Sequence, residues 1–471
     1  MEIKPTLGKH TVYASAYCKL DSNVELGGGT NETAIIQQIL DQAKVWGRLH
    51  LVMDGAALIS GIKVHSNTTI ECMDKACGFF LEAGSDEHII QNAEFSTTEY
   101  TTVNVTLKGG TYNHNGINQS MDVKEGHIFP IEESCNSCLT AFKFFGVKNF
   151  RMQDVTIVDQ RRYALLMGNW EDVLMENIHI PLPHIVHASN QDGLHFHSPG
   201  KHLTLRNIWG RCGDDFIAIN TDEGNKTESI TDVTIDGLYM ESATQGIRLL
   251  CRERGTLENV YINNVHGTVD SFCFYINPWF CDSEAYKTFP VYVQKSPDFD
   301  GYSGKFRNIT IQNVNVEMRN PTYTYNQQSL FCIGGDIENI VIQNASAKSD
   351  QPNFRMVTVR EGHASYQPQY TGISPTTVKN ITVDGVYLTG ADKTVAFQRP
   401  FAVEGMTEVE NMTVKNVIAE TAPTDNAFLT VDASAKVQEL NVSHFRLTGF
   451  ESAVAIDGSC EEKNEFDVKL K

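Results

Sequence analysis

A short phrase recurs along the chain from about residue 149 onward. In each copy apolar and polar residues alternate, an Asn or Asp usually follows, and the alternation then resumes. Copies stand at 148–157, 171–180, 201–210, 230–240, 257–267, 306–316, 337–347 and 378–388. Alternation with period two is typical of β-strands, and strands that repeat without helical segments between them indicate a solenoid. The phrase therefore predicts a stack of similar β-coils.

The spacing of the phrase gives the length of one coil. Its first apolar residue gives steps of 23, 30, 30 and 27 residues through successive copies, at Phe150, Val173, Leu203, Val233 and Val260. Asn at the centre of a copy suits a tight turn, because Asn tolerates the left-handed backbone region. Equal turns on stacked coils would form an Asn ladder. We predict an all-β fold, a right-handed parallel β-helix that forms a single domain over residues 1–471.

Two kinds of segment depart from the repeat. Residues 30–47 show helical apolar spacing after Thr30, an N-cap residue type, and we expect one amphipathic helix that caps the open N-terminal end of the solenoid. Longer steps later in the chain imply insertions at about 268–305 and 346–377. Long insertions on a rigid scaffold are often functional.

The net charge restricts the expected partners. The formal charge is −20, and binding to phosphate groups requires a basic face, so we expect neither nucleic acid nor an anionic membrane as a partner. No stretch approaches 18 consecutive apolar residues, and the N-terminus lacks the apolar segment of a signal peptide. We expect a cytoplasmic protein, unless a signal has been removed.

The cysteines agree with a reducing compartment. There are 11, an odd number scattered through a long chain, which does not indicate a disulfide framework. Cys135 and Cys138 form one CxxC, and because no second CxxC accompanies it, we interpret the pair as loop thiols. No nucleotide-binding motif is present, and we expect no cofactor and no metal. The oligomeric state is left open.

Three aspartates fall at the spacing of one coil. Asp214 and Asp215 follow Asp192 by 22 and 23 residues, and Arg248 lies 33 residues beyond Asp215. Residues one coil apart become neighbours in a parallel solenoid, so we expect these side chains to line one face on three consecutive coils. Carboxylates so close repel, and the pKa of at least one should rise. One carboxyl group then serves as an acid and another as a base, which is what glycoside hydrolysis requires.

The same residues resemble a known family. The segments NQDG (190–193), GDD (213–215) and GIR (246–248) are similar to the signature motifs of the polygalacturonase-like glycoside hydrolases of family 28, which fold as a pectin-lyase-type β-helix. The similarity covers roughly residues 140–270, and the repeat extends it weakly to both ends.

The resemblance implies a role for each matching residue. Asp214 corresponds to the general acid that protonates the leaving oxygen. Asp192 and Asp215 correspond to the pair that holds and deprotonates the attacking water, with inversion at the anomeric carbon. Arg248 would contact the sugar, and Asn190 would orient the acidic cluster.

The chain departs from the family pattern at two points. No Gly-His-Gly motif is found between residues 216 and 246, and Leu250 stands where the family carries a lysine that binds a uronic-acid carboxylate. Arg252 follows closely and is a candidate for substrate binding in its place. The substrate-recognition set is therefore less complete than the set of catalytic carboxylates.

Histidines and tryptophans supply further candidates for substrate binding. His195 and His197 follow NQDG; we expect them to point to opposite faces of a strand, so that at most one faces the site. Trp170, Trp209 and Trp279 lie on or near the central coils, and sugar rings stack on aromatic faces. Core packing explains Trp209 better, whereas Trp279 belongs to a long insertion and is the candidate for ligand contact.

Four functions fit these residues. The first is an inverting glycoside hydrolase acting on a pectin-like or related plant-derived oligo- or polysaccharide. The second is a transglycosylase or fructotransferase type of β-helix enzyme on neutral sugars, which the missing lysine favours. The third is a polysaccharide lyase, in which carboxylates bind Ca²⁺. The fourth is a β-helix that binds glycans without catalysis.

Overall fold

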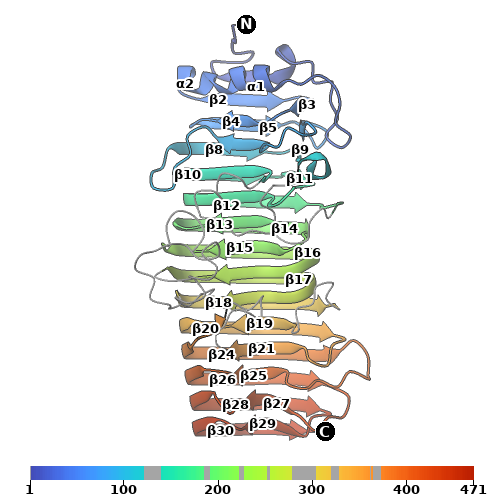
Figure 1. Cartoon of the computed structure of the whole chain (residues 1–471), viewed down its shortest axis with the longest axis vertical. Coiled ribbons are helices and arrows are strands. Elements are labelled where there is room, and N and C mark those ends of the chain that lie inside the picture. Colours follow the sequence, from blue (N-terminus) through green and yellow to red (C-terminus); the bar gives the residue numbers. More distant parts are fainter. Residues whose placement is uncertain are drawn as a thin grey trace. The chain divides into compact units, whose positions relative to one another are not determined.

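The computed structural model describes most of the chain (Figure 1). The described residues are 2–120, 139–184, 191–221, 228–251, 255–277, 304–319, 328–360, 362–363 and 373–471. The chain divides into two compact units. Unit 1 comprises Met1–Ala218 with Glu223–Lys226, and unit 2 comprises Ile219–Asp222 with Thr227–Lys471.

Unit 1 is a stack of parallel β-coils. Its strands are β1 Thr11–Tyr13, β2 Leu49–Met53, β3 Ala56–Ile59, β4 Ile62–Val64, β5 Thr68–Cys72, β6 Gly78–Leu81, β7 Ile90–Asn92, β8 Thr102–Lys108, β9 Thr111–Asn113, β10 Phe142–Gln153, β11 Thr156–Val158, β12 Leu165–Ile180, β13 Leu194–His197 and β14 Gly200–Arg211, and β15 Asp215–Asn220 begins in it. Phe150 pairs with Val173, and Val173 with Leu203. The coil steps predicted from the repeat are thus confirmed here.

Unit 2 continues the same pattern. Its strands are β16 Ile230–Leu250, β17 Thr256–Asn277, β18 Lys305–Met318, β19 Ser329–Ile333, β20 Asp336–Ser349, β21 Arg355–Arg360, β24 Thr376–Gly390, β25 Phe401–Glu404, β26 Thr407–Glu420, β27 Ala427–Val431, β28 Lys436–Thr448, β29 Ser452–Ile456 and β30 Ser459–Leu470, with an antiparallel pair, β22 Gly362–His363 and β23 Ile373–Ser374. Val233 pairs with Val260, and Val260 with Ile309. The predicted all-β fold, a right-handed parallel β-helix, is confirmed.

An asparagine ladder runs along one turn of unit 2. The side-chain amide of each member donates to the side-chain oxygen of the previous one at 2.8–3.2 Å, in the order Asn259, Asn308, Asn339, Asn380, Asn411. Asn259 and Asn308 adopt φ values of 57° and 54°, the left-handed region that Asn tolerates. A second ladder stands at the Asn inside the copies, where Asn344 donates to Asn313 at 3.2 Å, and it confirms the role predicted for the recurring Asn.

The N-terminal cap is shorter and more divided than the prediction of one helix over 30–47. Helix α1 spans Thr33–Leu40 and a second short helix, α2, spans Gln42–Trp46. The N-cap of α1 is Glu32 and not Thr30, whose backbone N–H and hydroxyl both donate to the carboxylate of Asp21. Ile36, Ile39 and Leu40 are fully buried, and α1 contacts β2 and β4, so the helices cover the first coil as expected.

The insertions are narrower than the predicted segments. Strand β17 continues to Asn277, so residues 268–277 are strand, and residues 278–303 lie outside the described part of the chain. Strand β21 lies within the segment predicted as the second insertion, 346–377, and pairs with β19 and β25. These strand pieces are buried on both faces, for example Met356, Val357 and Thr358, and therefore lack the alternation that marks the other coils.

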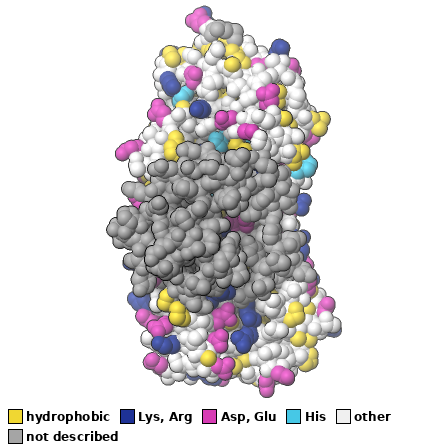
Figure 2. Space-filling model, viewed as in Figure 1, with side chains coloured by type: hydrophobic (Ala, Val, Ile, Leu, Met, Phe, Trp, Pro, Cys, Tyr) yellow, Lys and Arg dark blue, Asp and Glu magenta, His cyan; other side chains and the backbone are white. Residues whose placement is uncertain are grey.

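The described residues show a surface of mixed charge and thiols that form no disulfides. On the visible face, Lys and Arg side chains are interspersed with Asp and Glu (Figure 2). Eight cysteines lie among the described residues. All eight are free thiols, and seven of them are buried. No helix in the described ranges is long and apolar enough to cross a membrane.

The last coil carries charged residues where the preceding coils are apolar. Leu440 and Val442 of β28 belong to the core and are 0% and 1% exposed. Their partners in β30 are Lys463 and Glu465, whose side chains form an ion pair at 2.8 Å. Inward-pointing charges on an edge strand oppose pairing with another strand edge. The ion pair therefore covers this end of the apolar core with charge.

Replacing this ion pair by apolar residues, Lys463→Leu with Glu465→Val, is expected to cause self-association through β30. The change would extend the apolar rows to an open strand edge, the usual cause of edge-to-edge association. Size-exclusion chromatography with light scattering over a concentration series would measure it. The matched control is Glu462→Val with Lys469→Leu, which alters the outward rows of the same strand. Equal association of both double variants would contradict the role assigned to the ion pair.

Candidate active site

The two aspartate motifs lie on neighbouring coils of unit 1. The backbone N–H of Gly193 donates to the carbonyl of Asp215 at 2.9 Å, and the N–H of Gly213 donates to the carbonyl of Gln191 at 2.9 Å. Leu165 donates in the same way to Gly193, and its ladder partner is the next residue, Leu194. By the same offset Asp192 lies beside Asp215. The spacing of 23 residues therefore corresponds to one coil, as predicted.

The three carboxylates lie close enough to one buried thiol to raise its pKa. Cys212 is 3% exposed, and its Sγ donates to the backbone carbonyl of Asp214 at 3.1 Å. Burial raises the pKa of Cys212 well above its usual range, and the negative charges of Asp192, Asp214 and Asp215 raise it further. Asp192 and Asp215 are 1% and 2% exposed, whereas Asp214 is half-buried. The site thus combines two buried carboxylates with a more accessible one.

A histidine contacts the first of these carboxylates. Nδ1 of His195 lies 2.7 Å from Oδ2 of Asp192, and both side chains are at least 96% buried, with exposures of 4% and 1%. The His195 ring stacks on Tyr163, with centroids 4.4 Å apart and planes at 27°, and meets the His197 ring edge-on at 5.0 Å. The prediction that the two histidines point to opposite faces is wrong, because residues two apart in a strand share a face.

Trp170 supports this strand from inside the core. It is 0% exposed, and its Nε1–H donates to the backbone carbonyl of His197 at 3.0 Å. A sugar ring has no access to a buried indole, so the prediction of Trp170 as a stacking platform is wrong. Trp209 is half-buried and stacks on His179, with centroids 5.1 Å apart and planes at 13°, so this surface pair rather than the core holds it.

Several predicted residues fall elsewhere. Asn190, Arg252 and Trp279 lie outside the described residues. Arg248 belongs to unit 2, where it is half-buried and its guanidinium lies over the ring of Tyr275 at 5.6 Å. Its predicted stacking on the aspartates stays a prediction. Leu250, at the position of the family lysine, is 1% exposed and belongs to the core.

The coils before Asp192 add residues that carry no motif of their own. Gln160 is fully buried, and its side-chain amide donates to the backbone carbonyl of Asp192 at 3.2 Å. Lys143 is 4% exposed and occupies the same outward row as Leu166 and His195 on successive coils. Only the coil spacing, counted backwards from the aspartates, could have found these residues.

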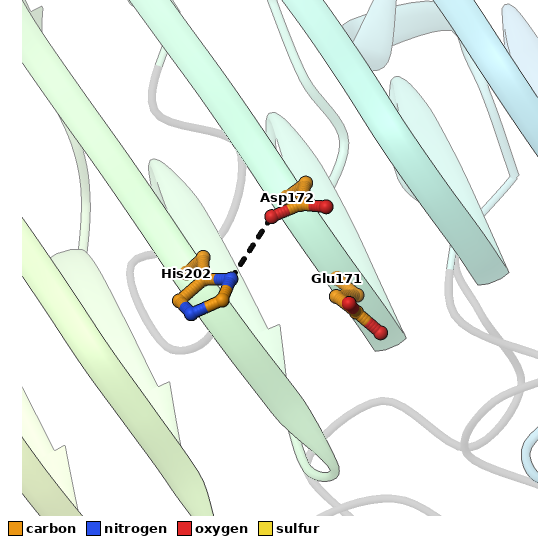
Figure 3. A group of neighbouring side chains, drawn as sticks. All are labelled: Glu171, Asp172 and His202. Atoms are coloured by element: carbon orange, nitrogen blue, oxygen red, sulfur yellow. Dashed lines mark hydrogen bonds and ion pairs between the residues drawn. The ribbon is translucent and has the colours of Figure 1, made fainter.

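A group of possible metal ligands lies at the turns within β12 and β14. Glu171, Asp172 and His202 each offer one possible ligand atom, and these three atoms lie within 4.8 Å of one another (Figure 3). Nδ1 of His202 is 2.9 Å from Asp172, and Glu171 forms an ion pair with Lys148 at 2.9 Å. Asp172 and His202 have φ values of 57° and 58°, as expected of ladder turns. These contacts account for the group as part of the surface ladder.

The loop that carries Tyr163 rests on a buried neutral histidine. Nδ1 of His114 accepts a hydrogen bond from the backbone N–H of Arg161 at 2.9 Å, and its Nε2 lies 3.0 Å from the carbonyl of Glu87. Both contacts are satisfied by the neutral ring with its proton on Nε2. Burial lowers the pKa of His114 to about 4, the hydrogen bond to Glu87 opposes the shift, and the charge of Arg161 adds to it.

This pKa predicts acid sensitivity. The unfolded chain binds a proton at His114 near pH 6.5, before the folded protein does, so stability is complete above that pH and falls as the pH drops toward 4. Between pH 7.5 and 5 the loss from this one group is on the order of 2 kcal/mol. Urea unfolding at both pH values would measure it. His114→Gln should show a weaker pH dependence than the surface variant His266→Gln; equal dependence would contradict the assignment.

Comparison with known proteins places these features in a family. Residues 60–237 match the sequence profile described as glycosyl hydrolases family 28, and that range contains the three aspartates and His195. A polygalacturonase of Persea americana is 24% identical over 213 residues, 38% of this chain and 44% of the relative. The matched part of the chain thus spans less than half the length of that relative.

Solved structures share the fold. The N-terminal fragment of gene product 12 of bacteriophage Phi29 superposes with a TM-score of 0.61 at 13% identity, over 97% of this chain and 71% of the fragment. A family 28 exopolygalacturonase of Yersinia enterocolitica superposes with a TM-score of 0.51 at 11% identity, over 98% of this chain and 78% of the enzyme. Residues 60–237 are therefore a glycosyl hydrolases family 28 domain, and the chain is a distant homologue of polygalacturonases.

Proposed function

We propose that the protein is an inverting glycoside hydrolase that cleaves a plant-derived, pectin-like oligo- or polysaccharide by acid/base catalysis. The observation that carries the proposal is the stacking of Asp192 beside Asp215, with Asp214 next in the chain, on two neighbouring coils. Burying carboxylates together costs free energy that no structural role in the coil turns requires. Two carboxyl groups with different environments are what inverting glycosidases use.

The family motifs suggest a division of roles, and Asp214 is the most accessible of the three carboxylates. Asp214, the more accessible residue, would hold a proton and donate it to the glycosidic oxygen as the bond to the leaving sugar breaks. Asp192 and Asp215, both buried, would hold a water molecule and accept its proton as its oxygen attacks the anomeric carbon. The attack comes from the face opposite the leaving group, so the product has the inverted configuration.

The substrate class is proposed from the family match and from the arginine of the family motif. Pectin-like chains carry carboxylates, and arginine binds carboxylates in a bidentate manner. Arg248 is the matching arginine of this chain, while Leu250 removes the family lysine from the same coil. The loss of this lysine also fits a neutral sugar as substrate, which is the substrate class of the transglycosylase alternative.

The experiment is reducing-sugar release with product analysis on a panel of galacturonides, rhamnogalacturonides, fructans and galactans. Wild type is compared with Asp214→Asn. Cleavage of one class by wild type and not by the variant supports the hydrolase and identifies the sugar. New oligosaccharides longer than the substrate would indicate transglycosylation. Equal glycan binding by both proteins without cleavage would reject the hydrolase in favour of a binding module.

A further inference from the structure

The contact between His195 and Asp192 fixes one oxygen of a proposed catalytic base. The distance of 2.7 Å between Nδ1 and Oδ2 is that of a charge-assisted hydrogen bond. The backbone of Asp192 is held as well, because its carbonyl accepts from the N–H of Ala164 at 3.1 Å and from Gln160 at 3.2 Å. With the main chain and one carboxylate oxygen fixed, the direction of the second oxygen is fixed too.

The imidazole itself is held against rotation. Tyr163 covers one face of the ring at a centroid distance of 4.4 Å, and His197 meets it edge-on at 5.0 Å. Trp170 donates to the carbonyl of His197 and so anchors the strand on which both histidines stand. These contacts come from two neighbouring coils and from the core. They give the ring one orientation, with Nδ1 toward Asp192.

We propose that His195 is a positioning residue for Asp192, acting through Nδ1, and not a substrate-binding residue. An imidazole N–H that donates to Asp192 favours the ionised carboxylate, the form that a base needs. It also aims the other carboxylate oxygen at the position of the attacking water. The inference rests on the proposed hydrolase function, since it assigns a role within that reaction.

Two substitutions separate the two ring nitrogens. The amide nitrogen of Asn stands at the same distance along the side chain as Nδ1 of His, and the amide nitrogen of Gln stands near the position of Nε2. His195→Asn is expected to keep kcat within about tenfold, while His195→Gln and His195→Ala lower it about 100-fold, with KM little changed. The proposal would be overturned if His195→Gln kept the wild-type kcat while His195→Asn lost it. It would also be overturned if the variants raised KM and left kcat unchanged.

A second measurement does not depend on activity. Long-range proton–nitrogen NMR of the wild-type imidazoles, with His195 assigned through His195→Asn, is expected to show a proton on Nδ1. In Asp192→Asn, which keeps the side-chain shape, the His195 signals should shift strongly. A wild-type ring without a proton on Nδ1 would refute the contact. If wild type cleaves no glycan while this proton is present, the hydrolase function fails and the hydrogen bond stands.

Discussion

Asp192→Asn is expected to lower kcat for glycosidic cleavage by about 10³-fold, within the range of 10² to 10⁴ that acid–base groups contribute. Asparagine keeps the size of the side chain and loses the ability to accept the proton of the attacking water. KM should change little, because the substitution removes an interaction that matters at the transition state. Initial rates on the substrate found with the oligosaccharide panel would measure the effect.

The matched control is Asp172→Asn. Asp172 is also an aspartate of unit 1, but it stands at a ladder turn whose counterpart on the preceding coil is Asn149. Asn is therefore the residue type that this turn already uses elsewhere, and the control should retain activity. An Asp192→Asn variant as active as this control would contradict the proposed role of the aspartate cluster.

A leaving-group comparison separates the acid from the base. Asp214→Asn should lose most of its activity on the natural glycoside but much less on an aryl glycoside, since a nitrophenolate departs without protonation. Asp192→Asn and Asp215→Asn should lose activity on both substrates, because the water still needs a base. Equal losses of all three variants on the aryl glycoside would contradict the assignment of Asp214 as the acid.

The coil stacking was predictable because the repeat has a fixed period and a strict inside–outside alternation. Phe150, Val173 and Leu203 were aligned from sequence alone, and they are ladder partners in the structure. The same count placed Asp192 one coil before Asp215. Where a strand is buried on both faces, as in β15 and β19, the alternation disappears and so does the prediction of its boundaries.

The surroundings of the aspartates were less accessible to sequence reasoning. Gln160, Tyr163 and Lys143 belong to coils before the motif, in segments that repeat no signature, and only the three-dimensional stacking brings them toward Asp192 or His195. The two tryptophans were ranked wrongly for a related reason. Trp170 ends a run of six buried residues in β12 where the alternation is lost, so the sequence did not show that it faces inward.

The exchange Trp170→Ala is expected to destabilise the protein by about 3–5 kcal/mol, the usual cost of removing a large aromatic side chain from a core. The indole is 0% exposed and meets the Phe196 ring edge-on, with centroids 5.7 Å apart. A Cβ added at Gly200 would lie only 2.1 Å from the indole, so the space around it is filled. Urea unfolding followed by fluorescence and circular dichroism would measure the loss.

Two further variants divide this loss into its parts. Trp170→Phe keeps an aromatic ring but leaves the carbonyl of His197 without its indole donor, which should cost about 1–3 kcal/mol for the buried acceptor. Trp209→Ala removes a half-buried indole stacked on His179 and should cost only about 1 kcal/mol. Because His197 meets the ring of His195, Trp170→Phe should also lower kcat while the protein remains folded. Equal destabilisation by Trp170→Ala and Trp209→Ala would contradict the distinction between a core and a surface tryptophan. An unchanged kcat in Trp170→Phe would show that the support of His197 by Trp170 does not affect catalysis.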